Sequence, residues 1–148
     1  MLKSISNFTR LTHLSLSQIG VTIIPRDIAI FSHLTKLTYL KLSHSILSYN
    51  TFKTILNLTQ LTTLDLSSNR LTGTIPIALA NLTQLNALDI SLNKLTNTIL
   101  VAKGNLTQLI ALDLSLNRIT STIPVSLSNL TQLNMLYLYS NRLIGIIP

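Results

Sequence analysis

Cysteine and tryptophan are absent from the 148-residue chain, and aromatic residues make up only 5% of it. Without cysteine, the chain can form neither disulfides nor thiolate metal sites. Acidic residues are scarce as well, with 4 Asp and Glu against 11 Lys and Arg, and the formal net charge is +7. Apolar residues reach 47%, but no run approaches the roughly 18 residues that a membrane-spanning helix requires. The sequence therefore predicts no transmembrane helix.

The segment Asn-Leu-Thr-Gln-Leu recurs at a fixed interval of 24 residues, beginning at Asn57, Asn81, Asn105 and Asn129. Two weaker copies precede these four. The repeats start near residues 8, 34, 58, 82, 106 and 130. A period of this length is typical of a solenoid, in which one supersecondary unit stacks on copies of itself. We predict a single domain over residues 1–148, with about six repeats, of which the last is truncated.

Each repeat, or coil, has apolar residues at positions 1, 4, 7, 9 and 14, and the last four repeats have asparagine at position 12. The fourth coil shows the pattern with Leu82, Leu85, Leu88, Ile90, Asn93 and Leu95. This pattern, Leu-x-x-Leu-x-x-Leu-x-Leu-x-x-Asn-x-Leu, resembles the leucine-rich repeat. The tail Leu71-Thr-Gly73-Thr-Ile75-Pro76 is similar to the plant-type subfamily, which is found mostly in ectodomains of receptor-like kinases, receptor-like proteins and polygalacturonase inhibitors.

The resemblance covers residues 8–148 and implies an α/β-type solenoid. Its right-handed coil should have a parallel β-sheet on the concave face and short turns or 3-10 segments on the convex face. The residues agree with this, because positions 7 and 9 alternate with polar neighbours as in a half-buried strand. Leu64 and Leu66 should point inward, while Thr63, Asp65 and Ser67 point outward.

Asparagine at position 12 follows the predicted strand, where its amide can pair with main-chain groups of the turning backbone. We therefore predict an internal ladder of Asn69, Asn93, Asn117 and Asn141. The first two coils have Ile19 and Ser45 at this position, so we expect them to be less well ordered. In the fourth coil Leu100 replaces the expected proline and Lys103 the expected leucine, which predicts either a local distortion or an outward-pointing lysine.

Outward residues of the strands are the candidates for partner binding, because stacked coils offer wide surfaces and few enclosed pockets. The outward residues include His13, Ser15, Ala87 and Ala111. The predicted binding residues among the outward set are Tyr39, Lys41, Thr63, Asp65, Asp89, Asp113, Met135, Tyr137 and Tyr139. Methionine and tyrosine are enriched at interfaces, so the last three predict an energetic hot spot. The alternatives are that these three contact a further coil of a longer protein, or that they decorate an exposed strand.

Two charged columns should run along the stack. One consists of Asp65, Asp89 and Asp113 at position 8, and the other of Arg70, Lys94, Arg118 and Arg142 at position 13. The aspartates could favour a cationic partner or a metal ion, or form a solvated ladder. The basic column could bind phosphates or acidic polymers, or form a solvated edge. No aromatic residues interleave with it and no nucleic-acid motif is present, which argues against nucleic acid as the partner.

Recognition of a protein or peptide ligand on the concave face is the predicted function. The alternative is a structural module that spaces or assembles other domains. His13, His33 and His44 cannot be combined with a nucleophile and an orienting acid by spacing, and no metal-ligand or phosphate-loop motif appears. We therefore predict no enzymatic activity, no cofactor and no metal site.

Five Asn-x-Thr acceptors for glycosylation point to the secretory pathway. They are Asn7, Asn57, Asn81, Asn105 and Asn129. Residues 4–10 are too polar for a secretory signal, so the chain taken as complete predicts a cytoplasmic protein. Because Pro148 falls inside the sixth repeat, we expect either a piece of a longer receptor-like protein, and then an extracellular or cell-surface location, or end-to-end pairing with another chain.

Overall fold

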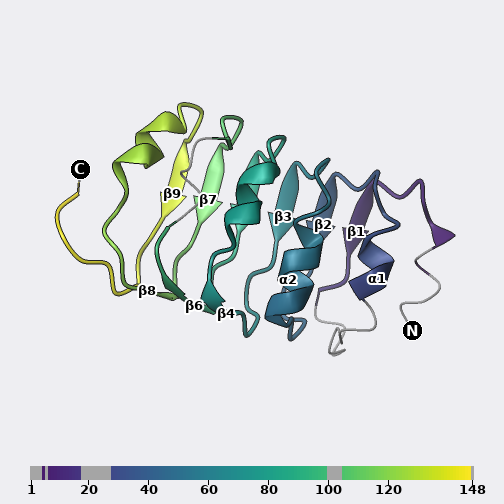
Figure 1. Cartoon of the computed structure of the whole chain (residues 1–148), viewed down its shortest axis with the longest axis horizontal. Coiled ribbons are helices and arrows are strands. Elements are labelled where there is room, and N and C mark those ends of the chain that lie inside the picture. Colours follow the sequence, from purple (N-terminus) through teal and green to yellow (C-terminus); the bar gives the residue numbers. More distant parts are fainter. Residues whose placement is uncertain (1–4, 6, 18–27, 100–104, 148) are drawn as a thin grey trace.

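Six short strands, one for each repeat, form a parallel sheet in the computed structural model, which describes residues 5, 7–17, 28–99 and 105–147. The strands are β1 (His13–Ser15), β2 (Tyr39–Lys41), β3 (Thr63–Asp65), β5 (Ala87–Asp89), β7 (Ala111–Asp113) and β9 (Met135–Tyr137). They pair in the order β1-β2-β3-β5-β7-β9 and follow one another along the long axis (Figure 1). The predicted solenoid with its parallel sheet is confirmed.

The repeat period is also the pairing register of this main sheet. Leu64 lies opposite Leu88, and Leu88 opposite Leu112, so residues 24 apart are Cα partners. These three leucines are buried, whereas their neighbours in each strand are half-buried. One face of the sheet is therefore the core face, and the residues between the leucines form its open face.

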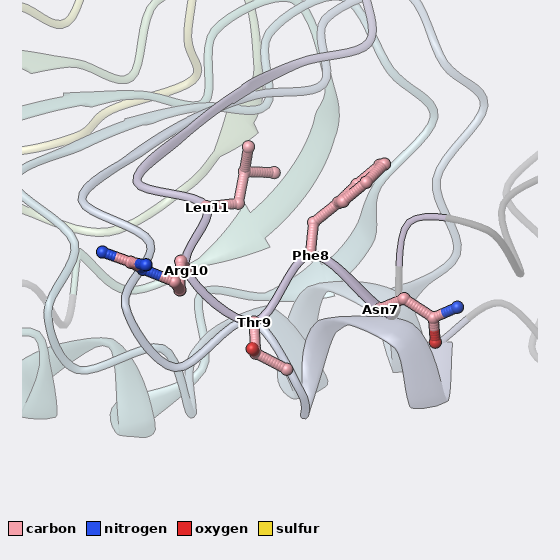
Figure 2. Close-up of a pocket in the computed structure, with 5 residues that line it drawn as sticks. All are labelled: Asn7, Phe8, Thr9, Arg10 and Leu11. Carbon is pink, nitrogen blue, oxygen red and sulfur yellow. The ribbon is translucent and has the colours of Figure 1, made fainter.

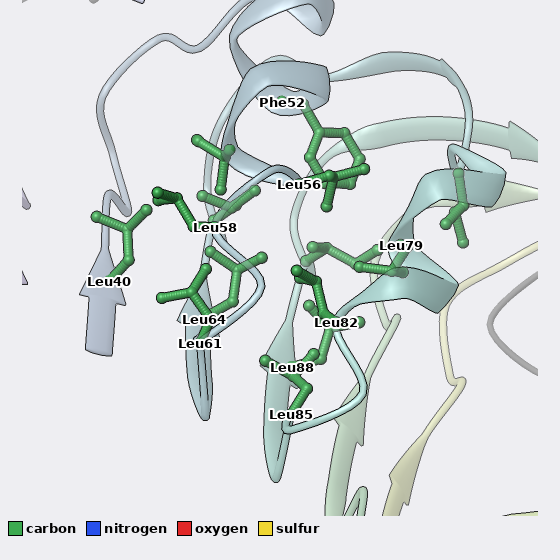
Figure 3. Close-up of a cluster of buried hydrophobic side chains, with 14 of the residues drawn as sticks. Leu40, Phe52, Leu56, Leu58, Leu61, Leu64, Leu79, Leu82, Leu85 and Leu88 are labelled. Carbon is green, nitrogen blue, oxygen red and sulfur yellow. The ribbon is translucent and has the colours of Figure 1, made fainter. Parts of the chain in front are cut away.

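The core lies between the main sheet and the segments that return from one strand to the next. Figure 3 shows leucines of the strands, such as Leu64 and Leu88, packed with Phe52 and Leu56 from the second coil and Leu79 from the third. Burial of each such side chain contributes about 2 kcal/mol. Because each coil packs on its neighbours, this contribution depends on stacking.

The return segments contain helices as well as the predicted 3-10 turns. They are α1 (Ile28–Phe31), α2 (Tyr49–Ile55), and the 3-10 helices η3 (Ile77–Asn81) and η5 (Val125–Asn129). Helix α2 begins where the Ser48 hydroxyl accepts a hydrogen bond from the Thr51 amide, and it buries Phe52 and Ile55. The predicted 3-10 segments are thus present in the third and fifth coils, while the first two coils contain α-helices in addition.

A second parallel sheet, which the sequence did not predict, follows the asparagine positions. It consists of β4 (Thr72–Thr74), β6 (Lys94–Asn97) and β8 (Arg118–Ile119), paired in that order. Its strands bend at the position of Gly73 (φ 81°), where Asn97 (φ 66°) and Gly145 (φ 83°) have the same left-handed backbone. Glycine and asparagine tolerate this conformation, which explains the glycine of the plant-type tail.

The position-12 asparagines form hydrogen bonds that connect neighbouring coils. The Asn93 amide donates to the carbonyl groups of Leu66 and Ile90 at 3.0 and 3.1 Å, and its oxygen accepts from the Leu71 amide at 2.9 Å. The same set of contacts recurs at Asn69, Asn117 and Asn141. Each asparagine thus pairs main-chain groups of its own coil and of the preceding one.

We expected Ser45 to make the second coil less well ordered, but it preserves part of this hydrogen bonding. Its hydroxyl is buried and donates to the Leu16 carbonyl at 3.1 Å, the contact to the preceding coil that asparagine makes elsewhere. Ile19, Leu100 and Lys103 lie outside the described residues. Serine is shorter than asparagine, yet it keeps one donor in the same place.

Candidate functional site

The open face of the main sheet contains a groove of about 270 Å3 that runs across five strands. Its lining comes from Tyr39, Thr63, Leu64, Asp65, Ala87, Leu88, Asp89, Ala111, Leu112, Asp113 and Tyr137. The three leucine side chains are buried, so they present main chain to the groove. Tyr39 on β2 and Tyr137 on β9 stand at its two ends, and the small side chains of Ala87 and Ala111 leave the middle open.

Six of the nine predicted binding residues are brought together in this groove: Tyr39, Thr63, Asp65, Asp89, Asp113 and Tyr137. Lys41, Met135 and Tyr139 lie outside its lining. Tyr139 packs edge-on against Tyr137, with ring centroids 6.5 Å apart, and Met135 is 43% exposed. The structure thus divides the predicted trio, because Tyr137 alone of the three reaches the groove.

Ala87 and Ala111, which the sequence also places among the outward residues of the strands, lie in the lining of the groove. Two consecutive coils have alanine at this strand position, where others have Thr63 or Tyr39. His13 is a further outward residue, and its ring stacks on Tyr39 with centroids 5.6 Å apart. The aromatic end of the groove therefore extends onto β1.

Each aspartate of the groove has one carboxylate oxygen engaged with its own strand end. Oδ1 of Asp65, Asp89 and Asp113 accepts a hydrogen bond from the amide two residues further on, at 2.8–2.9 Å. This Asx-type contact fixes the side chain and satisfies an amide at the end of the strand. The position-8 aspartates therefore have a structural role in addition to any role in binding.

The three carboxylates differ in their electrostatic surroundings. Burial would raise the pKa of Asp65, but hydrogen bonds from Ser67 and an ion pair with Lys41 hold it below its ordinary value. The same pair raises the pKa of Lys41, first through the hydrogen bond to Asp65. Burial raises the pKa of Asp89, and the charges of Asp65 and Asp113 add to this effect. The centre of the groove is therefore the place where negative charge is least compensated.

The basic column is exposed on the edge where the chain leaves the main sheet. Arg70, Lys94, Arg118 and Arg142 are all exposed, and among the described residues none of them forms an ion pair. The Lys94 amide donates to the Leu71 carbonyl and the Arg142 amide to the Ile119 carbonyl, so the column follows the hydrogen bonding between coils. None of its four cations belongs to the lining of the groove.

Further hollows border the stack, and two of them involve its first and last described coils. One, of about 390 Å3, is lined by Asn7, Phe8, Thr9, Arg10 and Leu11 beside the first strand (Figure 2). The other, of about 340 Å3, is apolar and includes Leu133, Leu136 and Ile147 of the sixth coil. End-to-end pairing, which the sequence allows, would cover the second hollow, and this pairing remains a prediction.

The asparagines of the five predicted glycosylation acceptors are all exposed, so a glycan could be attached without displacing the core. Within the described ranges, no group of three or more His, Asp or Glu side chains could hold a metal ion. The same ranges contain no helix with the length and apolar character needed to cross a membrane.

Comparison with known proteins supports the fold at both the sequence and the structure level. Models of the leucine-rich repeat match residues 60–82 and 101–143. A search of curated protein sequences gave no match. Among solved structures, the plant peptide hormone receptor RGFR1 in complex with RGF2 is 34% identical with a TM-score of 0.78, and the alignment covers 97% of this chain and 23% of the receptor.

The ectodomain of the receptor kinase SOBIR1 from Arabidopsis thaliana is 32% identical, with a TM-score of 0.77, and the alignment covers 90% of this chain and 73% of that one. A plant ice-binding protein is 31% identical, with a TM-score of 0.75, and the alignment covers 97% of this chain and 46% of that one. The chain thus spans from about a quarter to three quarters of the length of these relatives. With its repeats, its two sheets and these similarities, it belongs to the leucine-rich repeat family, and its fold is that of plant receptor ectodomains.

Proposed function

We propose that the chain binds an extended peptide or protein segment in the groove on the open face of the main sheet. The observation on which this rests is that eight outward side chains from five strands line one groove, with a tyrosine at each end. Tyrosine provides large contact area at low cost in conformational entropy, which suits it to anchor a ligand. Residues 1–148 would act as one recognition unit, without catalysis.

The relatives agree with this assignment. RGFR1 is a peptide hormone receptor, and another similar structure is the Arabidopsis receptor kinase HAESA in complex with the peptide hormone IDA and the co-receptor SERK1. The second of these is 31% identical, and the alignment covers 95% of this chain.

The charges of the groove define the ligand further. Lys41 compensates Asp65, whereas Asp89 and Asp113 form no ion pair with the described residues. A lysine, an arginine or a terminal amine on the ligand would supply the missing positive charge near Asp89, and its attraction would offset the burial of the carboxylate. We therefore propose a peptide with one basic group between two apolar or aromatic contacts.

Selection from a displayed library of random peptides tests this proposal. Enriched peptides should carry a basic residue, and they should bind the Ala87→Trp and Ala111→Trp variants at least tenfold more weakly, because the larger side chain fills the groove. Ile77→Trp is the control, since Ile77 is 62% exposed on η3, away from the groove. Enrichment of peptides that bind all three variants equally would contradict the groove as the site.

A second candidate function is contact with an ice surface, for which threonines of the second sheet provide a specific observation. Thr74 lies opposite Thr96, and Thr98, Thr120 and Thr122 are exposed on the same set of coils. Hydroxyls repeated at the strand spacing of about 4.8 Å could order water. The ice-binding relative agrees with this reading. Charged residues interrupt the array, however, since Thr96 lies opposite Arg118, and peptide recognition is therefore favoured.

An ice recrystallisation assay separates the two functions. Inhibition that is lost in a Thr98→Lys/Thr122→Lys variant, with unchanged peptide binding, would support contact with ice. Absence of inhibition in the unmodified chain would remove this candidate.

A further inference from the structure

Leucine occupies a backbone position that disfavours it in two neighbouring coils. Leu92 and Leu116 have φ values of 53° and 54°, in the left-handed region, and their side chains are 48% and 37% exposed. The equivalent residues His44, Ser68 and Ser140 have the same backbone conformation and are polar. Since neither the backbone nor the core requires leucine here, the two side chains indicate a use at the surface.

These leucines stand among the cations of the basic column. Leu92 is two residues before Lys94, and Leu116 is two residues before Arg118, with the inward-pointing asparagines between them. The Leu92 amide donates to the Ser115 carbonyl at 3.1 Å, which places the two coils side by side. We call this surface the rim and define it by Arg70, Leu92, Lys94, Leu116, Arg118 and Arg142.

The rim has positive charge without compensation. Its four cations are exposed, and in the described part of the chain the ion pair is the one between Lys41 and Asp65, on the open face of the main sheet. Four neighbouring coils at about 5 Å each spread the cations over roughly 15 Å. That length corresponds to roughly five residues of an extended segment or ten of a helix.

We propose that the rim binds an acidic segment of another protein whose apolar side chains pack on Leu92 and Leu116 while its carboxylates pair with Lys94 and Arg118. Charge complementarity selects the acidic partner. The exposed leucines select a protein over an anionic polysaccharide or a nucleic acid, because those polymers gain little from aliphatic side chains and the rim offers no aromatic ring for stacking. This surface is separate from the groove, and the inference does not depend on the function proposed for the groove.

Two synthetic peptides of about ten residues test this inference. One peptide alternates glutamate with leucine, and the other has serine in place of leucine. Fluorescence anisotropy measures the binding of each peptide. The leucine-containing peptide should bind at least tenfold more tightly, and its affinity should fall as salt is added because the contact is partly ionic.

A Leu92→Asn/Leu116→Asn variant separates binding from folding. Asparagine tolerates the left-handed backbone better than leucine, so the melting temperature should stay the same or rise while affinity for the leucine-containing peptide falls at least tenfold. Lys94→Glu/Arg118→Glu should abolish binding. Arg10→Glu/Lys36→Glu is the control, since it changes the charge equally at exposed residues beside another hollow and should leave affinity unchanged.

Three outcomes would overturn the inference. The first is equal affinity for the two peptides, the second is unchanged affinity in the asparagine variant, and the third is absence of binding by either peptide. Tight binding of polygalacturonate or phosphatidylserine vesicles, equal for the unmodified chain and for the Leu92→Asn/Leu116→Asn variant, would instead identify a general anion-binding surface. That result too would contradict the proposed protein partner.

Discussion

Nζ of Lys41 lies 2.9 Å from Oδ2 of Asp65, and this ion pair makes the first carboxylate of the groove different from the second. Asp65 has a lowered pKa, whereas burial and two flanking carboxylates raise the pKa of Asp89. Identical residues at equivalent places in the repeat thus contribute to stability with opposite sign. The difference arises because β2 has lysine at the position where β3, β5 and β7 have aspartate.

Asparagine substitution of these aspartates should change stability in opposite directions. Asn keeps the acceptor oxygen for the amide two residues on, so the charge is the main loss. Asp65→Asn should lower the free energy of unfolding at pH 7 by about 0.5 kcal/mol, because the exposed lysine limits the strength of the pair. Asp89→Asn should raise it by a similar or smaller amount, about 0.3 kcal/mol after solvent screening. Urea unfolding of both variants measures these changes.

The pH dependence follows from the directions of the pKa shifts. A lowered pKa in the folded state stabilises the fold above the unfolded value, so the contribution of Asp65 is lost as the pH falls below 3.8, through the lowered pKa. A raised pKa has the opposite effect, so the cost of Asp89 grows as the pH rises from 3.8 through the raised value. Changes of the same sign in both variants at pH 7 would contradict this assignment.

At position 12, the free energy of unfolding should be highest with asparagine, lower with serine and lowest with alanine. Asn93→Ala leaves main-chain groups of two coils unpaired in a site that is 7% exposed, and each such group costs about 1–3 kcal/mol. We expect a loss of about 3 kcal/mol in the free energy of unfolding. Asn93→Ser should lose less, because Ser45 shows that a hydroxyl can reach the preceding coil. Thermal unfolding measures the series.

The control for this series is Asn86→Ala, at an exposed asparagine of the same coil. It should leave the melting temperature nearly unchanged. A loss in Asn93→Ala as small as that in Asn86→Ala would contradict this prediction, because it would mean that the coil tolerates the unpaired main-chain groups, for example by admitting water.

The sequence predicts the path of the chain within each coil, because the same apolar pattern recurs in six repeats. Leu64, Leu88 and Leu112 had to share a face, and their 24-residue interval is the register of the sheet. The α2 helix was missed, although Ser48 could cap it and Phe52 and Ile55 have helical spacing. The second coil lacks the plant-type tail, and this departure indicated a different return segment. A prediction based on the average repeat does not include it.

The candidate site was less predictable, because it depends on distances between side chains of different coils. Sequence indicated which residues face outward, but not that Tyr137 lines a groove while Tyr139 packs outside it. The left-handed backbone at Leu92 and Leu116 was also invisible, since leucine gives no local signal for that conformation. At position 16 of the repeat, by contrast, Gly73 is itself a local signal for a left-handed backbone.

Gly73→Ala tests the left-handed bend of the second sheet. An added Cβ would meet only Tyr49, at 3.8 Å, so space is available and the cost should come from the backbone. With φ at 81°, we expect a loss of about 1 kcal/mol in the free energy of unfolding. Asn97→Gly is the matched change at the next coil and should alter stability by less than about 0.5 kcal/mol, because both residues tolerate this conformation. An equal loss in the two variants would contradict the backbone explanation.

Tyrosine variants should distinguish the groove from the surface beside it. Tyr137→Ala removes one end of the groove, and an aromatic side chain that a bound ligand covers contributes about 2 kcal/mol, which predicts a roughly 30-fold loss of affinity for a selected peptide. Tyr139→Ala should lower the affinity about threefold, because Tyr139 supports the Tyr137 ring edge-on without lining the groove.

Val125→Ala is the control, since Val125 is 72% exposed on η5. Far-ultraviolet circular dichroism should be the same for all three, so a loss of affinity reports on contact rather than on folding. Equal effects of Tyr137→Ala and Tyr139→Ala would move the binding site from the groove toward the edge strand β9.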